Sequence, residues 1–412
     1  MGKVRIVGGG LTGIVAALQA HRLGCRDIEL YEQYGQLGGA LLPRTDRGLE
    51  LRLSPYYFGG RNDPTRALLE WHGVAFDDFE EQVASVSPGP AREPQFVEGF
   101  AGPALAARQT ALEEPSGESL ADRLRAYPSE IEQALARYCQ WSLGVWLDEV
   151  HASAAEPLGL SRVWPRHSDA TMLAELKRAD ALYDGLYGLP RHIWSGSGNA
   201  RAALPRDGFA GLFSAAGRAL AGLGVKIHLE TLVSPREAIA DCRAGDALVW
   251  AAAPAALYKP MRLPAPKPIH KSMATYVFKA EGPGPLRLRN FTSLGCVARV
   301  STYKTHGETL LTAECVTEVK DSALRREIRG LMSGFGGVEL GEQLLSTVEL
   351  RGDYMSMAEA RSLQMLTAKL QQASGGAFVP GCWPGGLGHD GLAADLKAAL
   401  EPADPAKTAS AA

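Results

Sequence analysis

The chain has 412 residues, of which 46% are hydrophobic and 22% are charged, and its formal net charge is −3. These values are typical of a globular protein too long for one ordinary core, so two or three lobes are expected. The small negative charge gives no basis for binding nucleic acid or an anionic membrane, and no apolar segment is long enough to span a bilayer. Six scattered cysteines without metal-ligand spacing, and no secretion signal, predict reduced thiols, no metal site and a cytoplasmic protein.

Residues 3–7 predict a short buried strand, and a glycine-rich turn and the apolar helix 14–23 follow at once. Gly8 permits a sharp turn, Gly10 leaves room for a pyrophosphate near the backbone, and Gly13 lets the helix pack closely on the strand. The free amides at the start of the helix can then hold an anion. The predicted phosphate-binding residues are Gly8, Gly10, Leu11, Thr12 and Gly13.

A second strand is predicted at residues 28–31, and it ends in Glu32, nineteen residues after Gly13. A carboxylate at that place can accept hydrogen bonds from the ribose hydroxyls of an adenosine, and it disfavours the 2′-phosphate of NADP. Gln33 is included as a neighbouring contact. The order of strand, glycine turn, helix, strand and acid predicts a dinucleotide site. The alternative is that the glycines form only a tight loop.

Gly38 and Gly39 follow the acid by six and seven residues, and with them the sequence resembles the flavin amine oxidase superfamily. That group includes protoporphyrinogen oxidases and, more distantly, UDP-galactopyranose mutases. The resemblance implies that the dinucleotide is FAD and that the glycine pair belongs to its binding region. An arginine often follows the pair in such proteins, whereas this chain has Ala40, and Arg44 or Arg47 could take over that contact.

Residues 49–58 are predicted to form a strand or loop that enters the cofactor site. The mutases carry a histidine in this segment and this chain does not, while Tyr56 and Tyr57 could line a pocket or pack in the core. Residues 61–187 are expected to be a mainly helical insert. Its predicted helices are residues 119–127 and 129–146.

The segment 203–233 returns to the pattern of the resembled flavoproteins. A helix at 212–223 stops at Gly224, and a strand at 225–229 leads to Val233, which is counted among the predicted cofactor contacts. Residues 246–253 add another buried strand. The resemblance implies that this helix and strand extend the flavin lobe, which is therefore discontinuous in sequence.

A second sheet is predicted from strands at 273–278, 296–303, 309–315 and 344–350. The resemblance offers Lys271 as the lysine that holds a water against the flavin, and Arg299 as the arginine that contacts the substrate diphosphate in the mutases. A planar guanidinium suits phosphate or carboxylate equally well. Tyr303 and Tyr354 are further pocket candidates. A surface lysine and a solvated arginine on a strand edge are the alternatives.

Near the C-terminus a strand at 377–381 ends in Gly381, and a helix is predicted at 391–400. In the resembled families such a unit closes over the flavin, which assigns Gly381, Gly391 and Leu392 to the cofactor site. Cys382 stands where those families often have Arg or Asp, and it could be a buried thiol or a covalent flavin attachment. The tail 401–412, rich in Ala and Pro, is expected to be disordered.

Together these patterns predict an α/β fold with a discontinuous Rossmann-like FAD-binding domain and an α+β substrate-binding domain. The FAD-binding domain is expected to comprise residues 1–60, 195–262 and 372–400, and the substrate-binding domain residues 61–194 and 263–371.

For function, the resemblance implies an FAD-dependent oxidoreductase that removes a hydride from a small polar substrate such as an amine, with dioxygen as the expected oxidant. One alternative is a nucleotide-sugar isomerase that uses reduced FAD, as in the mutases. A second is a flavin-binding protein without catalysis. In each case the partner is a small molecule, and the chain could form a homodimer.

Overall fold

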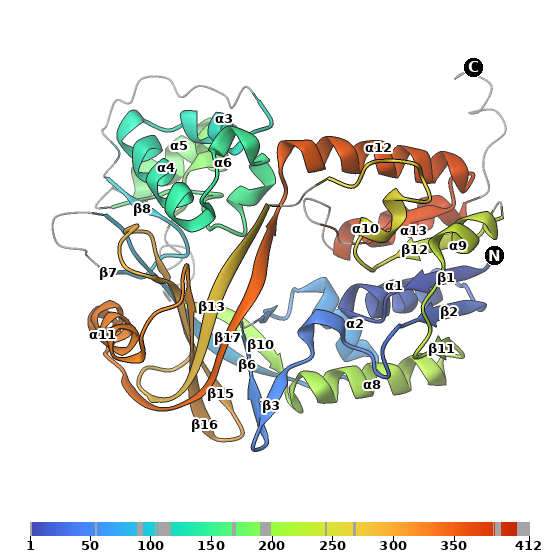
Figure 1. The fold of residues 1–412 in the computed structure, drawn as a ribbon, viewed down its shortest axis with the longest axis horizontal. Coiled ribbons are helices and arrows are strands. Elements are labelled where there is room, and N and C mark those ends of the chain that lie inside the picture. The colour runs from blue at the N-terminus through green and yellow to red at the C-terminus, as the bar shows by residue number, and fades with distance from the viewer. Residues whose placement is uncertain are drawn as a thin grey trace.

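The computed structural model describes residues 2–53, 56–88, 94–103, 105, 117–166, 170–189, 199–243, 245–266, 269–381, 383 and 389–401. Within these ranges the chain builds a five-stranded sheet and a nine-stranded sheet, with a group of short helices beside the larger one (Figure 1). The predicted α/β class, with a Rossmann-like sheet and a second sheet domain, is therefore confirmed. The predicted tail and Cys382 lie outside the described residues.

The smaller sheet is parallel throughout, and its strands are short and apolar because helices cover both of its faces. Its order is β11, β2, β1, β12, β18, so the chain starts in the centre and adds strands on both sides. The strands predicted at 28–31, 225–229, 246–253 and 377–380 are confirmed here. Their bounds are β1 Val4–Val7, β2 Ile28–Tyr31, β11 Lys226–His228, β12 Ala247–Trp250 and β18 Phe378–Pro380.

Two groups of helices cover this sheet. On one face Ile14 of α1, Phe213 of α8 and Leu396 of α13 share one apolar core with Leu69 of α2. On the other face α9, α10 and α12 pack against β12 and β18, with α12 and α8 on opposite sides of the strands in Figure 1. Their bounds are α1 Leu11–Arg22, α2 Pro64–Trp71, α8 Gly208–Gly222, α9 Pro235–Ala240, α10 Ala255–Tyr258, α12 Met357–Ala373 and α13 His389–Leu400.

The larger sheet has the order β17, β13, β16, β15, β14, β6, β10, β5, with β7 beside β6. It is antiparallel except for the pair β14 and β6. The four strands predicted for this sheet are confirmed. The bounds are β5 Phe58–Gly59, β6 Phe76–Val86, β7 Pro94–Gln95, β10 Asn199–Pro205, β13 Ile269–Glu281, β14 Leu286–Asn290, β15 Val297–Thr305, β16 Glu308–Cys315 and β17 Glu339–Tyr354.

The expectation that residues 61–187 are mainly helical is confirmed by most of the elements there, and strand β6 is the longest exception. It is eleven residues long and lies inside the larger sheet between β14 and β10. Its apolar residues Phe76, Phe79, Val83 and Val86 recur at three- and four-residue spacing, which is the pattern of a helix. The strand forms nevertheless because both neighbouring strands pair with it.

Two elements lie on the other side of the predicted domain boundaries. Strand β10 falls in the range 195–262 but pairs with β6 and β5 of the larger sheet. Helix α12 falls in the range 263–371 but packs through Leu366 and Leu370 against Leu248 of the parallel sheet.

The larger sheet lies between α11 (Asp321–Met332) and the parallel-sheet lobe (Figure 1). Leu324 and Ile328 of α11 pack on one face with Phe278. Leu51 of β4 packs on the other face with Tyr303. The hairpin formed by β3 (Arg44–Asp46) and β4 (Leu49–Leu51) therefore joins the two sheets.

The short helices form a separate core at one end of the larger sheet. Leu135 of α4 and Tyr187 are fully buried there, and Phe291, at the end of β14, belongs to the same core. The elements of this group are α3 Leu120–Arg125, α4 Ser129–Leu143, η2 Leu147–Glu149, η3 Ala152–Ala155, α5 Ala170–Ala179 and α6 Ala181–Leu186. The predicted helices at 119–127 and 129–146 correspond to α3 and α4.

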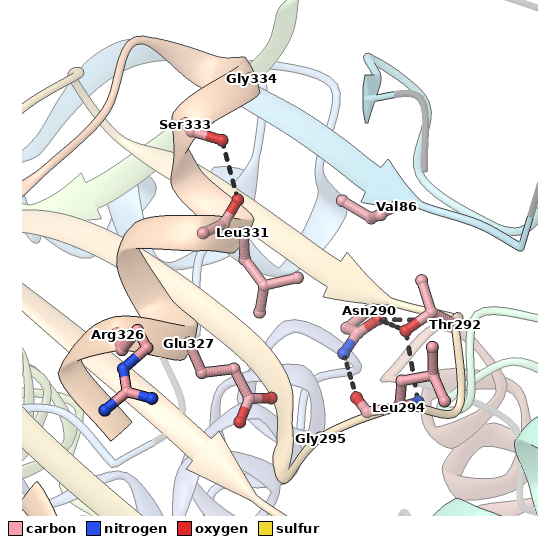
Figure 2. Close-up of a pocket in the computed structure, with 11 residues that line it drawn as sticks. Val86, Asn290, Thr292, Leu294, Gly295, Arg326, Glu327, Leu331, Ser333 and Gly334 are labelled. Atoms are coloured by element: carbon pink, nitrogen blue, oxygen red, sulfur yellow. Dashed lines mark hydrogen bonds between the residues drawn. The ribbon is translucent and has the colours of Figure 1, made fainter. Parts of the chain in front are cut away.

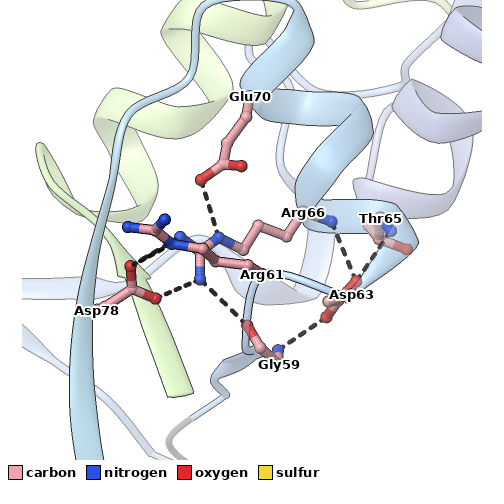
Figure 3. Close-up of polar contacts among 7 residues, drawn as sticks. All are labelled: Gly59, Arg61, Asp63, Thr65, Arg66, Glu70 and Asp78. Carbon is pink, nitrogen blue, oxygen red and sulfur yellow. Dashed lines mark hydrogen bonds and ion pairs between the residues drawn. The ribbon is translucent and has the colours of Figure 1, made fainter. Parts of the chain in front are cut away.

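A buried arginine ties α2 to the larger sheet (Figure 3). Arg66 is 2% exposed, and its guanidinium bonds Asp78 of β6 at 2.5 Å and Glu70 at 2.9 Å. The hydrogen bond to Asp78 raises the pKa of Arg66. Asp63 caps the start of α2 and also accepts the amide of Gly59 in β5 at 2.8 Å. Every charge in this junction has a partner of opposite sign or a backbone dipole.

Glu29 of β2 provides a similar anchor at the parallel sheet. Its carboxylate lies 2.8 Å from Nζ of Lys3 and accepts the hydroxyl of Tyr31 at 2.6 Å, with Lys226 at 3.4 Å. Burial alone would raise the pKa of Glu29, but these hydrogen bonds together lower it to about 2. The ionised form is therefore preferred in the folded state.

Replacing Glu29 by Gln should lower the free energy of unfolding at pH 7 by roughly 2 kcal/mol. A carboxyl with a depressed pKa stabilises the fold above its unfolded pKa near about 4.3 and loses that contribution as the pH falls toward 2. The difference between wild type and variant, measured by urea unfolding at several pH values, should shrink over that window. A pH-independent difference, or an equal loss in the exposed control Glu281→Gln, would contradict this account.

Candidate functional site

The predicted cofactor residues converge at one edge of the parallel sheet. Parallel strands place their carboxyl ends on the same edge, which is where ligands bind in open α/β sheets. Gly8 follows β1, Glu32 follows β2, and Gly381 follows β18. The start of α13 reaches the same edge, because His389 contacts Thr12 of α1.

The glycines of the first turn differ in what surrounds them. A Cβ on Gly13 would lie 1.9 Å from the carbonyl oxygen of Gly8, and a Cβ on Gly8, whose φ is +109°, would lie 2.9 Å from the amide of Ala252. Both positions are closed by backbone. A Cβ on Gly10 would meet nothing nearer than 3.9 Å. Gly10 therefore borders open space, and it does so at the start of a helix.

Helix α1 begins without a side-chain cap. Gly10 occupies the N-cap position, and among the described residues no acceptor bonds the amides of Leu11, Thr12 or Gly13. Helix N-termini leave such amides free and carry a partial positive charge. This end of α1 therefore offers donors to an anion.

Glu32 is held in place by backbone. One carboxylate oxygen accepts the amide of Gly9 at 2.7 Å, the other accepts the amide of Tyr34 at 2.9 Å, and the residue is 6% exposed. Each oxygen keeps a second acceptor direction for a ligand. The neighbouring Gln33 is exposed. The contact with Gly9 was not part of the prediction, although the triple glycine is visible in the sequence.

The second glycine pair lies directly against the first turn. The amide of Gly38 bonds the carbonyl of Gly9 at 2.9 Å, and a Cβ on Gly39 would lie 3.2 Å from Cα of Gly10. The φ of Gly38 is +135°, and a Cβ there would lie 2.5 Å from Leu42. Only glycines allow this close approach of two backbones.

The arginines considered as replacements for Ala40 have other partners. Arg44 forms an ion pair with Glu349, and Arg47 bonds Glu342 at 2.8 Å. Both carboxylates belong to β17. These arginines therefore join the β3–β4 hairpin to the larger sheet.

The remaining predicted cofactor residues lie at two places. Leu392 is 3% exposed and shares a core with Leu11, and Gly391 precedes it in α13. Val233 packs in the core on the opposite face of the sheet, while Thr231, two residues earlier, donates its amide to the carbonyl of Glu32 at 2.9 Å.

His389 is a contact that the sequence did not reveal. Its imidazole lies 3.4 Å from the hydroxyl of Thr12 through Nε2 and 3.0 Å from the hydroxyl of Thr65 through Nδ1. It joins the starts of α13, α1 and α2. The partners are separated by more than three hundred residues, so no local pattern marks them.

A row of polar side chains crosses the face of the larger sheet opposite α11, with Thr275, Glu314 and Ser85 buried and Arg299 and Arg289 half-buried. Thr275 of β13 pairs with Glu314 of β16, which pairs with Arg299 of β15, then Arg289 of β14 and Ser85 of β6. Arg299 bonds Glu314 at 2.7 Å, and that carboxylate raises the pKa of Arg299. Among the described residues the hydroxyls of Thr275 and Ser85 have no partner, and both residues are fully buried.

The other predicted catalytic candidates lie around this row. Tyr354 is close enough for the charges of Arg299 and Arg289 to act on it, although burial raises its pKa. Tyr303 lies four residues after Arg299 in β15, and its hydroxyl accepts a hydrogen bond from the amide of Arg52 at 2.8 Å. The backbone of Lys271 pairs with β17, and its side chain lies outside the described part of the chain. The structure thus brings Arg299 and Tyr354 together and leaves Tyr303 at a second place.

A cavity of about 580 Å³ lies elsewhere, between α11 and the end of β14 (Figure 2). It is lined by polar groups that include Asn290, Arg326 and Glu327. Glu327 accepts hydrogen bonds from the amides of Cys296 and Val297 at 2.9 and 2.8 Å, so its carboxylate already has backbone partners. None of the predicted site residues lines this cavity.

The described residues contain no group of His, Cys, Asp and Glu side chains arranged to hold a metal ion. A second search, for a helix both long and apolar enough to cross a bilayer, also found none in this part of the chain.

The comparisons with known proteins agree with this geometry. A family profile described as an NAD(P)-binding Rossmann-like domain matches residues 6–70. A reduced UDP-galactopyranose mutase superposes with a TM-score of 0.59 at 14% identity, covering 91% of this chain and 89% of that one. The chain shares its fold. A comparison of the sequence with curated proteins found no match.

Two further structures extend the likeness over nearly the whole chain. A protein from Exiguobacterium sp. 255-15, provisionally named protoporphyrinogen oxidase, has a TM-score of 0.56 at 14% identity, with 97% of each chain covered. A double mutant of putrescine oxidase has a TM-score of 0.51 at 14% identity and covers 97% of this chain and 98% of that one. The resemblance predicted from the sequence is therefore confirmed at the level of the fold.

Under the expectation that this edge of the sheet binds FAD, replacing Gly10 by Ala should weaken that binding by roughly tenfold or more while the fold is kept. The added methyl group enters the open space beside the free amides, and the φ of −74° at Gly10 suits alanine. Calorimetry with FAD and thermal unfolding measure the two effects. Gly222→Ala, in α8 with nothing within 4 Å of the new Cβ, is the matched control. Equal FAD affinity in both variants would exclude Gly10 from the site.

Proposed function

We propose that the protein is an FAD-dependent oxidoreductase that removes a hydride from a small polar substrate bearing an amine or a similar C–N group, with dioxygen reoxidising the flavin. The observation that carries the proposal is the uncapped start of α1 beside Gly10, with the buried carboxylate of Glu32 at the end of the next strand. The shared fold over nearly the whole chain supports it.

The residues at the sheet edge fit FAD. The amides of Leu11, Thr12 and Gly13 would hold the pyrophosphate, and Gly10 leaves it room. Glu32 would accept the ribose hydroxyls through the acceptor directions that its two amide contacts leave free. Bound FAD would supply the hydride acceptor, and the protein would supply orientation and electrostatics.

The buried polar row would orient the substrate. Arg299 keeps its guanidinium in a fixed place through Glu314, and Tyr354 adds a hydroxyl near the same charges. Glu314, Thr275 and Ser85 are at most 2% exposed, whereas the side chain of Arg299 is 30% exposed and so can be reached by a ligand. An amine bound there in its unprotonated form would need no further base. The role of Lys271 in holding a water stays a prediction.

A nucleotide-sugar isomerase remains the second candidate because of one observation. Arg289 and Arg299 face each other on adjacent strands, and Glu314 is the carboxylate that bonds one of them. Two guanidinium groups beside one carboxylate leave a net positive charge that would suit a diphosphate. The segment 53–58, which has no histidine, argues against this candidate.

The purified protein should be yellow, and under nitrogen an amine from a screened panel should bleach the flavin band. Admission of air should restore the band and release hydrogen peroxide. Turnover of a UDP-sugar only after reduction with dithionite would instead select the isomerase. A flavin spectrum without response in either experiment would favour a binding protein without catalysis, and a colourless protein that refuses FAD would exclude all three.

Replacing Arg299 by Lys should raise the KM of the amine that reduces the flavin in that screen by roughly tenfold. Lysine keeps the charge beside Glu314 but loses the planar fork of donors. Alanine would remove the ion pair with the buried carboxylate of Glu314 altogether, so it is a poorer choice than lysine. Arg326→Lys, on the exposed side of α11, is the control. An unchanged KM in Arg299→Lys would remove this residue from the substrate site.

A further inference from the structure

Arg52 is a buried cation placed between the two sheets. It follows β4, is 8% exposed, and lies where three elements meet. Its amide bonds the hydroxyl of Tyr303 in β15 at 2.8 Å, and its carbonyl accepts the hydroxyl of Thr312 in β16 at 2.6 Å. Its guanidinium lies 5.5 Å from the ring centre of Phe209 at the start of α8. The backbone of this residue is therefore fixed from both sides.

The charge of Arg52 is poorly balanced. Its Nη2 lies 3.4 Å from Oε2 of Glu50, which is the one carboxylate contact that the guanidinium makes among the described residues. The other oxygen of Glu50 already accepts the amide of Phe209 at the start of α8. Nε and Nη1 of Arg52 have no hydrogen-bond partner in the described chain. Two of its three nitrogens are thus buried and unpaired.

Arg66 shows how this chain treats a buried arginine that serves the fold. Its guanidinium bonds two carboxylates, Asp78 and Glu70, and the carbonyl of Gly59. A buried charge without such partners lowers stability, and a buried donor without an acceptor does so as well. Among the described residues Arg52 therefore has the surroundings of a buried cation that still lacks a full set of partners.

The orientation of the guanidinium is defined by aromatic rings. It lies 5.0 Å from the ring centre of Tyr303 and 5.5 Å from that of Phe209. Such cation–π contacts use no N–H donor, so the donors of the guanidinium stay available to a planar oxyanion. The hydroxyl of Tyr57 is also buried and without a partner among the described residues, and Arg52 is one of the charges that act on it.

We propose that the free edge of Arg52 binds a carboxylate of the substrate, so that the substrate is an amine that also carries a carboxylate. The inference rests on the proposed function for the amine, and on the unpaired donors of Arg52 for the anion. A carboxylate offers two oxygens that match a guanidinium fork, and desolvation between the sheets strengthens the contact. The binding site would then use residues from both lobes: Arg52 from the hairpin side and Tyr303 from the larger sheet.

The test uses the full-length FAD-loaded protein with two probes, benzoate and its neutral analogue benzamide. Binding is followed by the change in flavin absorbance and by the shift in Tm. Wild type should bind benzoate roughly tenfold more tightly than benzamide. Arg52→Met should remove that preference, and Arg52→Lys should retain part of it. Arg61→Gln, an exposed arginine that pairs with Asp78 at 3.7 Å, should behave as wild type.

Measurements of Tm and of FAD affinity distinguish substrate binding by Arg52 from a structural role and from a role in cofactor binding. Arg52→Met should change Tm little, because it removes two unpaired donors together with one long contact to Glu50, whereas Arg66→Met should lower Tm clearly. A loss of Tm in Arg52→Met as large as that in Arg66→Met would show a structural role and overturn the proposal. A weakened FAD affinity with the benzoate preference intact would assign Arg52 to the cofactor instead.

The same experiment distinguishes failure of this inference from failure of the proposed function. Benzoate binding needs no turnover, so it can be positive even where no amine bleaches the flavin. Absence of any preference for benzoate in wild type overturns the inference. Inorganic phosphate serves as a third probe. If it binds more tightly than benzoate, the inference is also overturned, because the site would then be one for phosphate.

Discussion

The contact between Gly13 and Gly8 is the constraint on which the site depends. The carbonyl of Gly8 occupies the place where a side chain of Gly13 would begin, so α1 can lie directly against the end of β1. That approach fixes the start of α1 at the edge of the sheet and leaves its free amides next to Gly10. The carboxylate of Glu32 then bonds Gly9, which sets the distance between the first two strands at the same edge.

A second organising feature is the way in which the arginines around the larger sheet are paired with carboxylate or carbonyl groups. Arg66 has two carboxylates, Arg299 has Glu314, and Arg289 donates to the carbonyl of Pro157. Among the described residues, the one carboxylate contact of the Arg52 guanidinium is a long one, with a carboxylate that the start of α8 shares. Buried ionic groups that are fully paired hold elements together, and those that are not are typical of functional sites.

The proteins that share this fold carry names of different chemistries, a mutase and two oxidases. A fold with such breadth does not decide the reaction, which lies in the residues of the site. In this chain the residues that we propose for the substrate belong to the larger sheet and to the segment after β4. These residues are Arg299 and Arg52, and no glycine motif in the sequence marks either position.

The sequence determined the N-terminal unit from strand β1 to Glu32, because its strands, glycines and acid act on neighbours within about thirty residues and leave a local pattern. It also predicted the five strands of the parallel sheet and four of the nine strands of the larger sheet. It did not predict β6, whose helix-like spacing yields to pairing with β14 and β10. The partners of Arg52 and His389 lie hundreds of residues away, at Thr312 and Thr12, so only the tertiary structure decided them. Long-range pairing carries no signal in a single sequence, since either partner alone reads as an ordinary polar residue.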